Sequence, residues 1–439
     1  MLRNCGHKLM QLAFERGAAI AIIVSGTLAS GTLQAFQQRM EPNLRGATIS
    51  PNYDEPWIEP AGYQDTTQNQ SPTTTQQPNT PRRPVAPSNQ FATNSANRTL
   101  GGAGGPGPKS TYMMGDFFFS NGQLFVPNPQ GIGKDIIIGE LPGSGGSRRV
   151  KISENNSPIP RDRVFFNYNH FHNAIRVRSN TPYDMNVDRY TPGFEKTFWD
   201  GMASVELRTP IAISQNPDLN LLSVGPDRET MFGNMTVATK LLLWQDDLDA
   251  VAVGMGINLP TGPDTRILQA NNQPPALTIF NESVHLMPYI GVLRTPTDRT
   301  FIHAYVQVDV DANGNGVFDQ FGNKGGDLND QTLFYADLAM GYWMYRAPEA
   351  YLVTGIAPTI EFHYTTSLND ADILTGGVLG PFGMGNTFNR VDVANATLAT
   401  QFYFGSRNIL TVGAVLPLSQ TESERQFDAE VVFQFNRFY

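Results

Sequence analysis

Beyond residue 163 the sequence is built from segments of roughly ten residues in which apolar and polar side chains alternate. Clusters rich in Asn, Asp, Gly and Pro separate these segments. The final segment shows the pattern most clearly. Its apolar face holds Phe427, Ala429, Val431, Phe433, Phe435 and Tyr439, and its polar face holds Asp428, Glu430, Gln434 and Asn436. Because successive side chains of a strand point to opposite sides, each segment has one face suited to an apolar environment and one suited to water.

The length of the segments indicates which environment the apolar faces meet. Strands of globular proteins are most often about 5–6 residues long, whereas crossing a bilayer takes about 9–11 residues of a tilted strand. The runs 333–345 and 390–404 meet the longer requirement. We therefore predict an all-β chain that folds into a transmembrane antiparallel β-barrel.

The number of segments predicts the size of the barrel. Eleven segments begin near Arg163, Phe194, Asn234, Leu248, Ser283, Arg299, Thr332, Ala350, Thr387, Arg407 and Arg425. One more strand from residues 111–151 would make twelve, an even number as in single-chain bacterial barrels. We expect about twelve strands.

The first 35 residues carry the pattern of a secretory signal peptide. Arg3, Lys8 and Arg16 precede the apolar run 17–27, and the segment ends in Leu33-Gln34-Ala35. We predict cleavage before Phe36. The single cysteine of the chain, Cys5, lies inside the part to be removed, so the mature chain is expected to lack disulfides, a thiol nucleophile and cysteine metal ligands.

The rest of the chain divides by composition into three parts. Residues 36–110 form a Pro-, Gln-, Thr- and Gly-rich stretch with few large apolar residues, which predicts a disordered spacer and a contact with the cell wall. Residues 111–162 contain short β-like pieces between Gly- and Pro-rich turns, and a first strand, a plug and a small periplasmic subdomain all fit them. Residues 163–439 are the predicted barrel.

Charge and motifs exclude several function classes. The formal net charge of −9 argues against a nucleic-acid partner. The chain contains no G-x-S-x-G, no H-E-x-x-H and no phosphate-binding loop, so we predict no catalytic residues and no enzymatic activity.

Six ionisable residues fall on the polar faces of the predicted strands and would line a barrel lumen. They are His285, His303, Asp309, Asp337, Glu361 and His363. Charged side chains around a pore influence which solutes pass. We predict a selective rather than a catalytic role for them.

One acidic, Gly-containing segment resembles a calcium-binding loop. With Asp311 at position 1, oxygen ligands fall at Asn313, Asn315 and Asp319, but the acidic residue expected at position 12 is replaced by Gly322. A weak calcium site and an ordinary loop between strands are both open, and no other cofactor is expected.

Three stretches resemble known protein families. The end of the chain, Phe435-Asn436-Arg437-Phe438-Tyr439, resembles outer-membrane barrels, whose last strand the barrel assembly machinery recognises. Residues 251–264 (VAVGMGINLPTGPD) look like the strand and turn of outer-membrane channels from pathways that degrade phenol and other aromatic compounds, which are related to long-chain fatty-acid transporters. Residues 164–173 and the spacer are similar to exported proteins of planctomycete-type bacteria. The resemblance implies a porin-like barrel in a bacterial outer membrane that contacts lipid and transports small solutes, including apolar or aromatic ones.

Other functions remain open at this point. A structural or adhesive outer-membrane anchor without transport is the main alternative. An outer-membrane hydrolase with a dispersed site and a secreted soluble β-protein are further alternatives, since a soluble β-sandwich also alternates polar and apolar residues.

Overall fold

The computed structural model describes residues 111–119, 122–128, 135–177, 183–220, 227–269, 274–419, 421 and 424–439. All of them belong to the compact unit Gln90–Tyr439. The predicted signal peptide, residues 1–35, and the predicted spacer, residues 36–110, lie outside the described residues. Within those described, the helices are the short 3-10 turns η1 (Gly143–Gly146) and η2 (Gly377–Leu379), neither of which has the length or apolar composition of a membrane-crossing helix.

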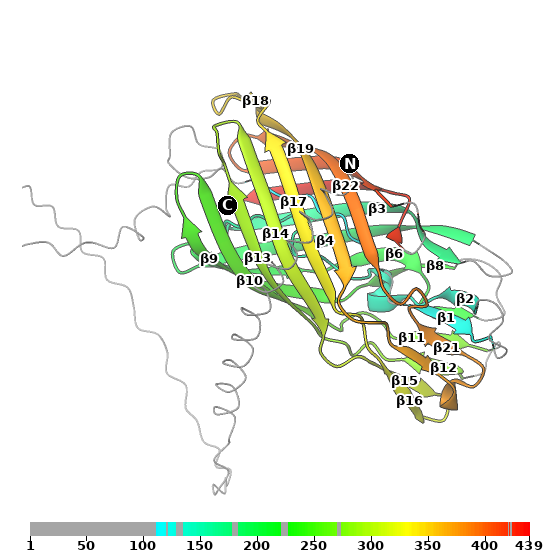
Figure 1. Ribbon diagram of the computed structural model, residues 1–439. Coiled ribbons are helices and arrows are strands. Elements are labelled where there is room, and N and C mark those ends of the chain that lie inside the picture. The colour runs from blue at the N-terminus through cyan, green and yellow to red at the C-terminus, as the bar shows by residue number, and fades with distance from the viewer. Residues whose placement is uncertain are drawn as a thin grey trace, which may run out of the picture. The chain divides into compact units, whose positions relative to one another are not determined.

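Twelve strands among the described residues close into one antiparallel ring, which we call the wall (Figure 1). The wall strands are β3 (Arg163–Val177), β4 (Tyr183–Phe198), β5 (Ala203–Arg208), β9 (Met235–Gln245), β10 (Asp249–Leu259), β13 (His285–Arg294), β14 (Thr300–Asp311), β17 (Leu333–Tyr342), β19 (Val353–Ser367), β22 (Asp392–Phe404), β23 (Asn408–Pro417) and β24 (Ala429–Phe438). Each pairs with the wall strands before and after it along the chain, and β24 pairs with β3 to close the ring. The predicted barrel of about twelve strands is confirmed.

The predicted origin of the twelve strands was wrong in one respect. All wall strands come from residues 163–439, and no strand within the described part of 111–162 joins the ring. One strand of residues 163–439 was not counted, because a single segment was expected to begin near Phe194. That residue lies inside β4, and β5 follows as a separate strand. Pro192 and Gly193 look like a turn in the sequence, yet both pair with β3 in the ladder.

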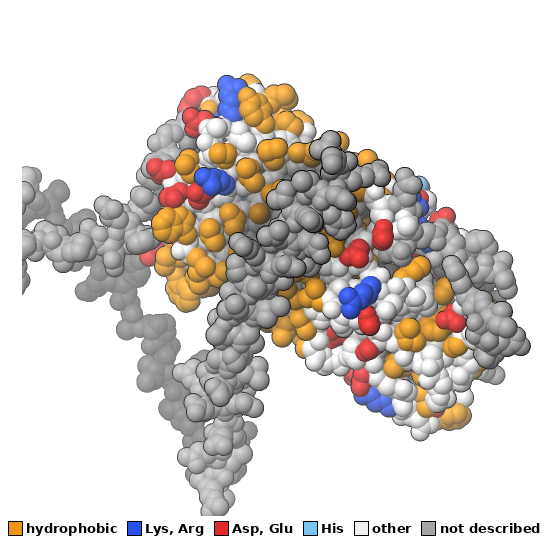
Figure 2. Space-filling view, in the orientation of Figure 1, with side chains coloured by type: hydrophobic (Ala, Val, Ile, Leu, Met, Phe, Trp, Pro, Cys, Tyr) orange, Lys and Arg blue, Asp and Glu red, His pale blue; other side chains and the backbone are white. Residues whose placement is uncertain are grey.

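The side chains of the wall alternate as predicted. In β24, Val431, Phe433 and Phe435 are about 40% exposed, whereas Gln434 and Asn436 are fully buried. On the face seen in Figure 2, hydrophobic side chains spread over the wall strands and charged side chains gather toward the ends. The wall therefore presents an apolar outer face and a polar inner face, as a membrane barrel requires.

The two proline positions inside wall strands have different consequences. Pro288 pairs with Met255 of β10, but the ladder between β13 and β14 is interrupted at residues 287–288. A proline has no N–H to donate, so an interruption at this position is expected. Pro358 in β19 pairs with Thr400 of β22 without a break in register.

The two ends of the barrel differ in the length of their connections. At the short-turn end, residues 199–202, 246–248, 295–299 and 405–407 connect consecutive strands, and the chain ends there at Tyr439. At the opposite end, which we call the loop end, the connections carry further strands. Two of these, β6 (Ile211–Gln215) and β8 (Arg228–Phe232), pair with each other and extend the sheet beyond β5 and β9. At the short-turn end, the two-residue strand β18 (Tyr345–Arg346) pairs with Gly355 and Ile356 of β19.

Two small sheets form a cap at the loop end. One contains β1 (Gln123–Val126), β2 (Ile136–Glu140), β20 (Ile373–Thr375) and β21 (Gly383–Gly385), and the other contains β7 (Asp218–Asn220), β11 (Thr265–Leu268), β12 (Leu277–Ile279), β15 (Asn315–Asp319) and β16 (Lys324–Leu328). Figure 1 shows both beside the ends of the wall strands. They share a hydrophobic core that includes Leu124, Ile267, Val317 and Met384. The cap thus joins the N-terminal hairpin β1–β2 to four of the long connections.

Candidate functional site

The lumen of the barrel is the candidate site, and it is occupied by the chain itself. Residues 111–119 and 147–160, which we call the inner segment, are buried along nearly their whole length. Their polar partners come from β3, β4, β5, β14, β17, β19, β22 and β24, which stand on opposite sides of the ring. A segment in contact with strands all around a closed ring must lie inside it.

Residues 111–119 run through the lumen from the short-turn end to the loop end. Thr111 Oγ1 lies 2.5 Å from His303 Nε2, near the start of β14. Farther along, the backbone N–H groups of Met114 and Gly115 donate to the Glu361 carboxylate at 2.9 and 3.2 Å. Phe119 then packs at the loop end in a cluster with Leu333 and Val391. The hairpin β1–β2 follows within the cap.

Residues 147–160 return through the lumen to the short-turn end. Arg149 Nε donates to Asp309 Oδ2 at 2.9 Å near the loop end, and the backbone N–H of Ile152 donates to Gln307. Asn155 Nδ2 donates to the side chain of Asn167 in β3. Ile159 lies in a cluster of aromatic and aliphatic side chains at the short-turn end, and β3 then begins.

The centre of the lumen contains a buried ion-pair group. Lys151 Nζ lies 2.7 Å from Asp116 Oδ1 and 3.0 Å from Asp337 Oδ1. His363 Nδ1 lies 2.9 Å from the same Asp337 oxygen. Lys151 is therefore a charged contact between the inner segment and the wall.

A second buried ion-pair group connects wall strands near the short-turn end. Arg163 donates to Glu195 at 2.8 Å and to Glu206 at 2.6 Å. Lys240 pairs with Glu195 at 2.9 Å, and Arg208 pairs with Glu206 at 2.5 Å. These pairs link the neighbouring wall strands β3, β4, β5 and β9 on the inner face of one side of the ring. Arg208 also donates to the carbonyl oxygens of residues 151 and 152, so this group holds the inner segment as well.

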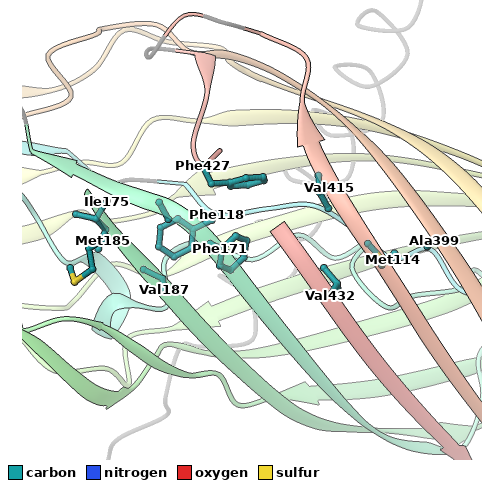
Figure 3. Packing of buried hydrophobic residues seen from close by; sticks show 11 residues of the cluster. Met114, Phe118, Phe171, Ile175, Met185, Val187, Ala399, Val415, Phe427 and Val432 are labelled. Atoms are coloured by element: carbon teal, nitrogen blue, oxygen red, sulfur yellow. The ribbon is translucent and has the colours of Figure 1, made fainter. Parts of the chain in front are cut away.

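Apolar contacts also join the inner segment to the wall. Met114 and Phe118 of the inner segment pack in one cluster with Phe171 and Val432 of the wall, as Figure 3 shows. The ring centroids of Phe118 and Phe171 are 4.8 Å apart. At the short-turn end the Tyr112 ring lies 5.7 Å from that of Phe438. The lumen is therefore filled by both polar and apolar contacts.

The structure places all six predicted lumen residues on the inner face. His285, His303, Asp309, Asp337, Glu361 and His363 are each at most 4% exposed. Four of them bond directly to the inner segment: His303, Asp309, Asp337 and Glu361. In this state they hold the inner segment and do not line an open passage. Their influence on the choice of solute stays a prediction.

The predicted calcium-loop residues lie at the loop end, where they stabilise turns. Asp311 ends β14, and Asn315 and Asp319 are the first and last residues of β15, about 13 Å apart along the strand. Side-chain oxygens of Asp311, Asn313, Asn315 and Asp319 accept hydrogen bonds from backbone N–H groups at 2.8–2.9 Å. Calcium binding by these four residues stays a prediction.

The sequence reasoning missed the partners of the predicted residues. Lys151, Asp116 and Arg149 belong to the part of the chain whose role was left open. Glu206 and Lys240 were a detectable signal, since each is a charged residue at an inward position of its strand. No sequence signal shows which of these charges pair.

Comparisons with known proteins found likeness in structure but not in sequence. The sequence matches no protein-family model and none of the curated proteins. An outer membrane channel from Pseudomonas putida F1 has a TM-score of 0.42 at 11% identity, with 65% of this chain and 97% of that chain covered. The P. putida toluene transporter TodX has 0.29 at 7% identity, with 65% and 91% covered. CdiB from Escherichia coli has 0.32 at 9% identity, with 72% and 67% covered. TM-scores this low assign neither a family nor a solute to this chain.

Proposed function

We propose that this protein is a channel or passive transporter for small solutes in a bacterial outer membrane, and that its inner segment closes it. The observation that carries the proposal is the polar inner face of the wall. Several of its charged and amide side chains bond to residues 111–119 and 147–160, which are not strands of the wall. A shift of that segment would expose a polar passage through an intact ring.

The exterior of the wall supports the membrane location. Leu338, Met340, Ile360, Leu398 and Phe433 are all outward and at least 40% exposed, which a soluble protein would avoid over so large an area. Trp199 and Trp244 are exposed at the short-turn end, where a membrane interface would place aromatic rings. With the predicted signal peptide, this exterior fits an outer-membrane barrel in contact with lipid.

Aromatic rings on the inner face favour apolar or aromatic solutes. Phe301, Trp343, Tyr403 and Phe438 form one cluster inside the short-turn end. The ring centroids of Trp343 and Tyr403 are 4.6 Å apart. Such rings offer an aromatic solute stacked or edge-on contacts worth about 0.5–1.5 kcal/mol each. We propose that a solute contacts this cluster as it enters or leaves the lumen.

A structural or adhesive anchor is the second candidate, and the cap is the observation that favours it. The cap joins the N-terminal hairpin β1–β2 to long connections through a shared core, which is a large ordered surface at the loop end. An anchor has no need for an inner segment that shifts. The two candidates therefore differ in whether the barrel ever conducts.

Planar-bilayer recording of the full mature chain separates the two. A channel predicts discrete conductance steps with long closed periods, because the inner segment seals the lumen most of the time. Liposomes that contain the protein should also take up a small aromatic solute faster than empty liposomes. A heat-resistant β-rich protein that never conducts and never accelerates uptake would support the anchor.

A further inference from the structure

Three potential metal ligands meet at the loop end of the barrel, outside the ion-pair groups of the lumen. They are His285, the first residue of β13, Asp311, the last residue of β14, and Asp330, which precedes β17. One ligand atom from each lies within 4.8 Å of the other two. The three residues are distant in sequence, so the fold and not a local loop brings them together.

The side chains of His285 and Asp330 approach each other at a distance that suits two ligands of one cation. His285 Nε2 lies 3.3 Å from Asp330 Oδ2, and the side chains of both are at least 95% buried. Asp330 Oδ2 nevertheless has no hydrogen-bond partner. Two atoms bound to one Zn²⁺ at about 2.1 Å in a tetrahedral arrangement are themselves about 3.4 Å apart. A buried, unpartnered carboxylate oxygen at this distance from an imidazole nitrogen thus fits a shared cation.

The second nitrogen of His285 is held as in known histidine metal ligands. His285 Nδ1 lies 2.8 Å from Asp309 Oδ1. A carboxylate on the far nitrogen fixes the ring so that the other nitrogen points its lone pair at the metal. Asp309 is in turn held by Arg149 of the inner segment, with 2.7 Å between Arg149 Nη2 and Asp309 Oδ2.

Carboxylates also gather at this place. Those of Asp309, Asp311 and Asp330 surround a largely buried point, and the guanidinium of Arg149 pairs with Asp309. Uncompensated buried charge is costly. Asp311 Oδ2 accepts a single hydrogen bond, from the Asp330 N–H at 2.8 Å, and so has a lone pair left for a metal.

The other cluster of this type already contains its cation. Asp116, Asp337 and His363 also present three ligand atoms within 4.8 Å of one another. There, Lys151 Nζ lies 2.7 and 3.0 Å from the two carboxylates. Among the described neighbours of the His285 cluster no lysine makes such a contact, and Arg149 pairs with Asp309.

We propose that His285, Asp311 and Asp330 bind a divalent metal ion of the zinc class. An imidazole with two carboxylates is a donor set suited to Zn²⁺, whereas Ca²⁺ takes oxygen ligands. A small pocket lined in part by Asp330, Gln331 and Asn386 adjoins the cluster at Asp330. The bound metal joins β13 and β14 to the loop before β17, and it reaches the inner segment through Asp309 and Arg149.

The test is zinc binding by the full mature chain in detergent, without a polyhistidine tag. After treatment with EDTA and dialysis against Zn²⁺, we expect one Zn²⁺ per chain. X-ray absorption at the zinc edge should show one imidazole among oxygen ligands. His285→Gln and Asp330→Asn should each weaken binding by more than about 100-fold in competition with a chromogenic chelator, since loss of an outer partner alone costs 10–100-fold.

Two control variants keep the test specific. His303→Gln removes a buried lumen histidine outside the cluster, and His170→Gln removes a partly exposed histidine that pairs with Asp188. Both should retain one Zn²⁺ per chain. If His285→Gln does not fold, the zinc affinity of Asp330→Asn and the X-ray absorption spectrum of the unaltered chain still test whether the cluster binds zinc.

Three outcomes would overturn the proposal. The first is a chain that binds no Zn²⁺ and carries a protonated His285 between Asp309 and Asp330, as seen in its imidazole NMR signals. The second is full zinc retention by both His285→Gln and Asp330→Asn. The third is binding of Ca²⁺ but not Zn²⁺ that is lost in Asn315→Ala, which would assign the cation to the predicted calcium loop.

Discussion

The wall and the inner segment are both buried parts of one chain, but different forces hold them. Each wall strand shares a backbone ladder with two neighbours, such as the ten residue pairs that join β24 to β3. Among the described residues of the inner segment, by contrast, the β-pairing is a single bridge between Met113 and Asn156. Its other contacts are side-chain hydrogen bonds, ion pairs and packed rings.

This difference between backbone ladders and side-chain contacts indicates which part of the molecule can move. A closed ladder resists local opening because each broken strand leaves backbone groups without partners in lipid. The inner segment can shift at the cost of its side-chain contacts, while the wall stays closed. A barrel that is closed by side-chain contacts is therefore suited to gating. Loss of a single contact should change the open probability when the contact belongs to the inner segment, and the heat resistance when it belongs to the wall.

The largest effect is expected for Lys151→Met. The change leaves the buried carboxylates of Asp116 and Asp337 without their cation, and removal of one partner from a buried ion pair typically costs about 3–5 kcal/mol. We expect a strong rise in open probability in planar bilayers and faster proteolysis near residue 151. The temperature at which the heat-resistant barrel unfolds should change much less. Equal open probability in the variant and the unaltered chain would contradict a gating role for this contact.

An intermediate effect, confined to the wall, is expected for Gly341→Ala. A Cβ at this position would overlap the ring of Phe301 on the neighbouring strand β14. Overpacking of this kind costs about 1–3 kcal/mol. The barrel should lose its heat resistance at a lower temperature, with no rise in open probability at room temperature. A variant that gates more often but unfolds normally would reverse the roles given to the two regions.

The wall could be predicted from the sequence because the alternation of polar and apolar side chains is a local pattern. In β24 the inward positions Glu430, Gln434 and Asn436 and the outward position Phe433 follow from period-two alternation alone. At Pro192-Gly193 the local pattern suggested a turn within β4, and one strand was therefore not counted. Alternation along each strand places side chains, and pairing between strands follows from chain order.

The contacts of the inner segment could not be predicted, because they join residues that lie far apart in the sequence. Nothing near Lys151 in the sequence identifies Asp337 as its partner, which lies 186 residues away. The same holds for the zinc-class cluster, in which Asp330 reaches His285 through the loop that separates β14 from β17. Sequence patterns placed His285, Asp309 and Asp337 on the inner face, and the closed ring determined what they touch.

The smallest effect is expected for Arg390→Ala at the loop end. Arg390 donates to Asp370 at 2.8 Å in an exposed pair, and this bond holds the pKa of Asp370 below its ordinary value. Loss of the pair should return the pKa of that carboxyl toward its ordinary value, which NMR titration of a carboxyl-labelled sample measures. Exposed pairs contribute little to stability, so heat resistance and open probability should stay unchanged. A clear change in either would mean that the exposed loops take part in the seal.

A reversible cross-link tests most directly whether the inner segment closes the channel. An ideal Cβ on Gly146 lies 2.8 Å from Ser214 Cβ in β6, and a disulfide joins Cβ atoms about 3.8 Å apart, so the bond requires a shift of about 1 Å. Gly146 has a φ of +73°, in the left-handed region, so a cysteine there also carries backbone strain. Because β3 begins at Arg163, this bond fixes both ends of residues 147–160.

The measurement is single-channel conductance of Gly146→Cys/Ser214→Cys before and after reduction, with each single variant as a control. We predict a silent oxidised protein that conducts like the unaltered chain once reduced. Conductance that is equal with and without the disulfide would contradict closure by the inner segment.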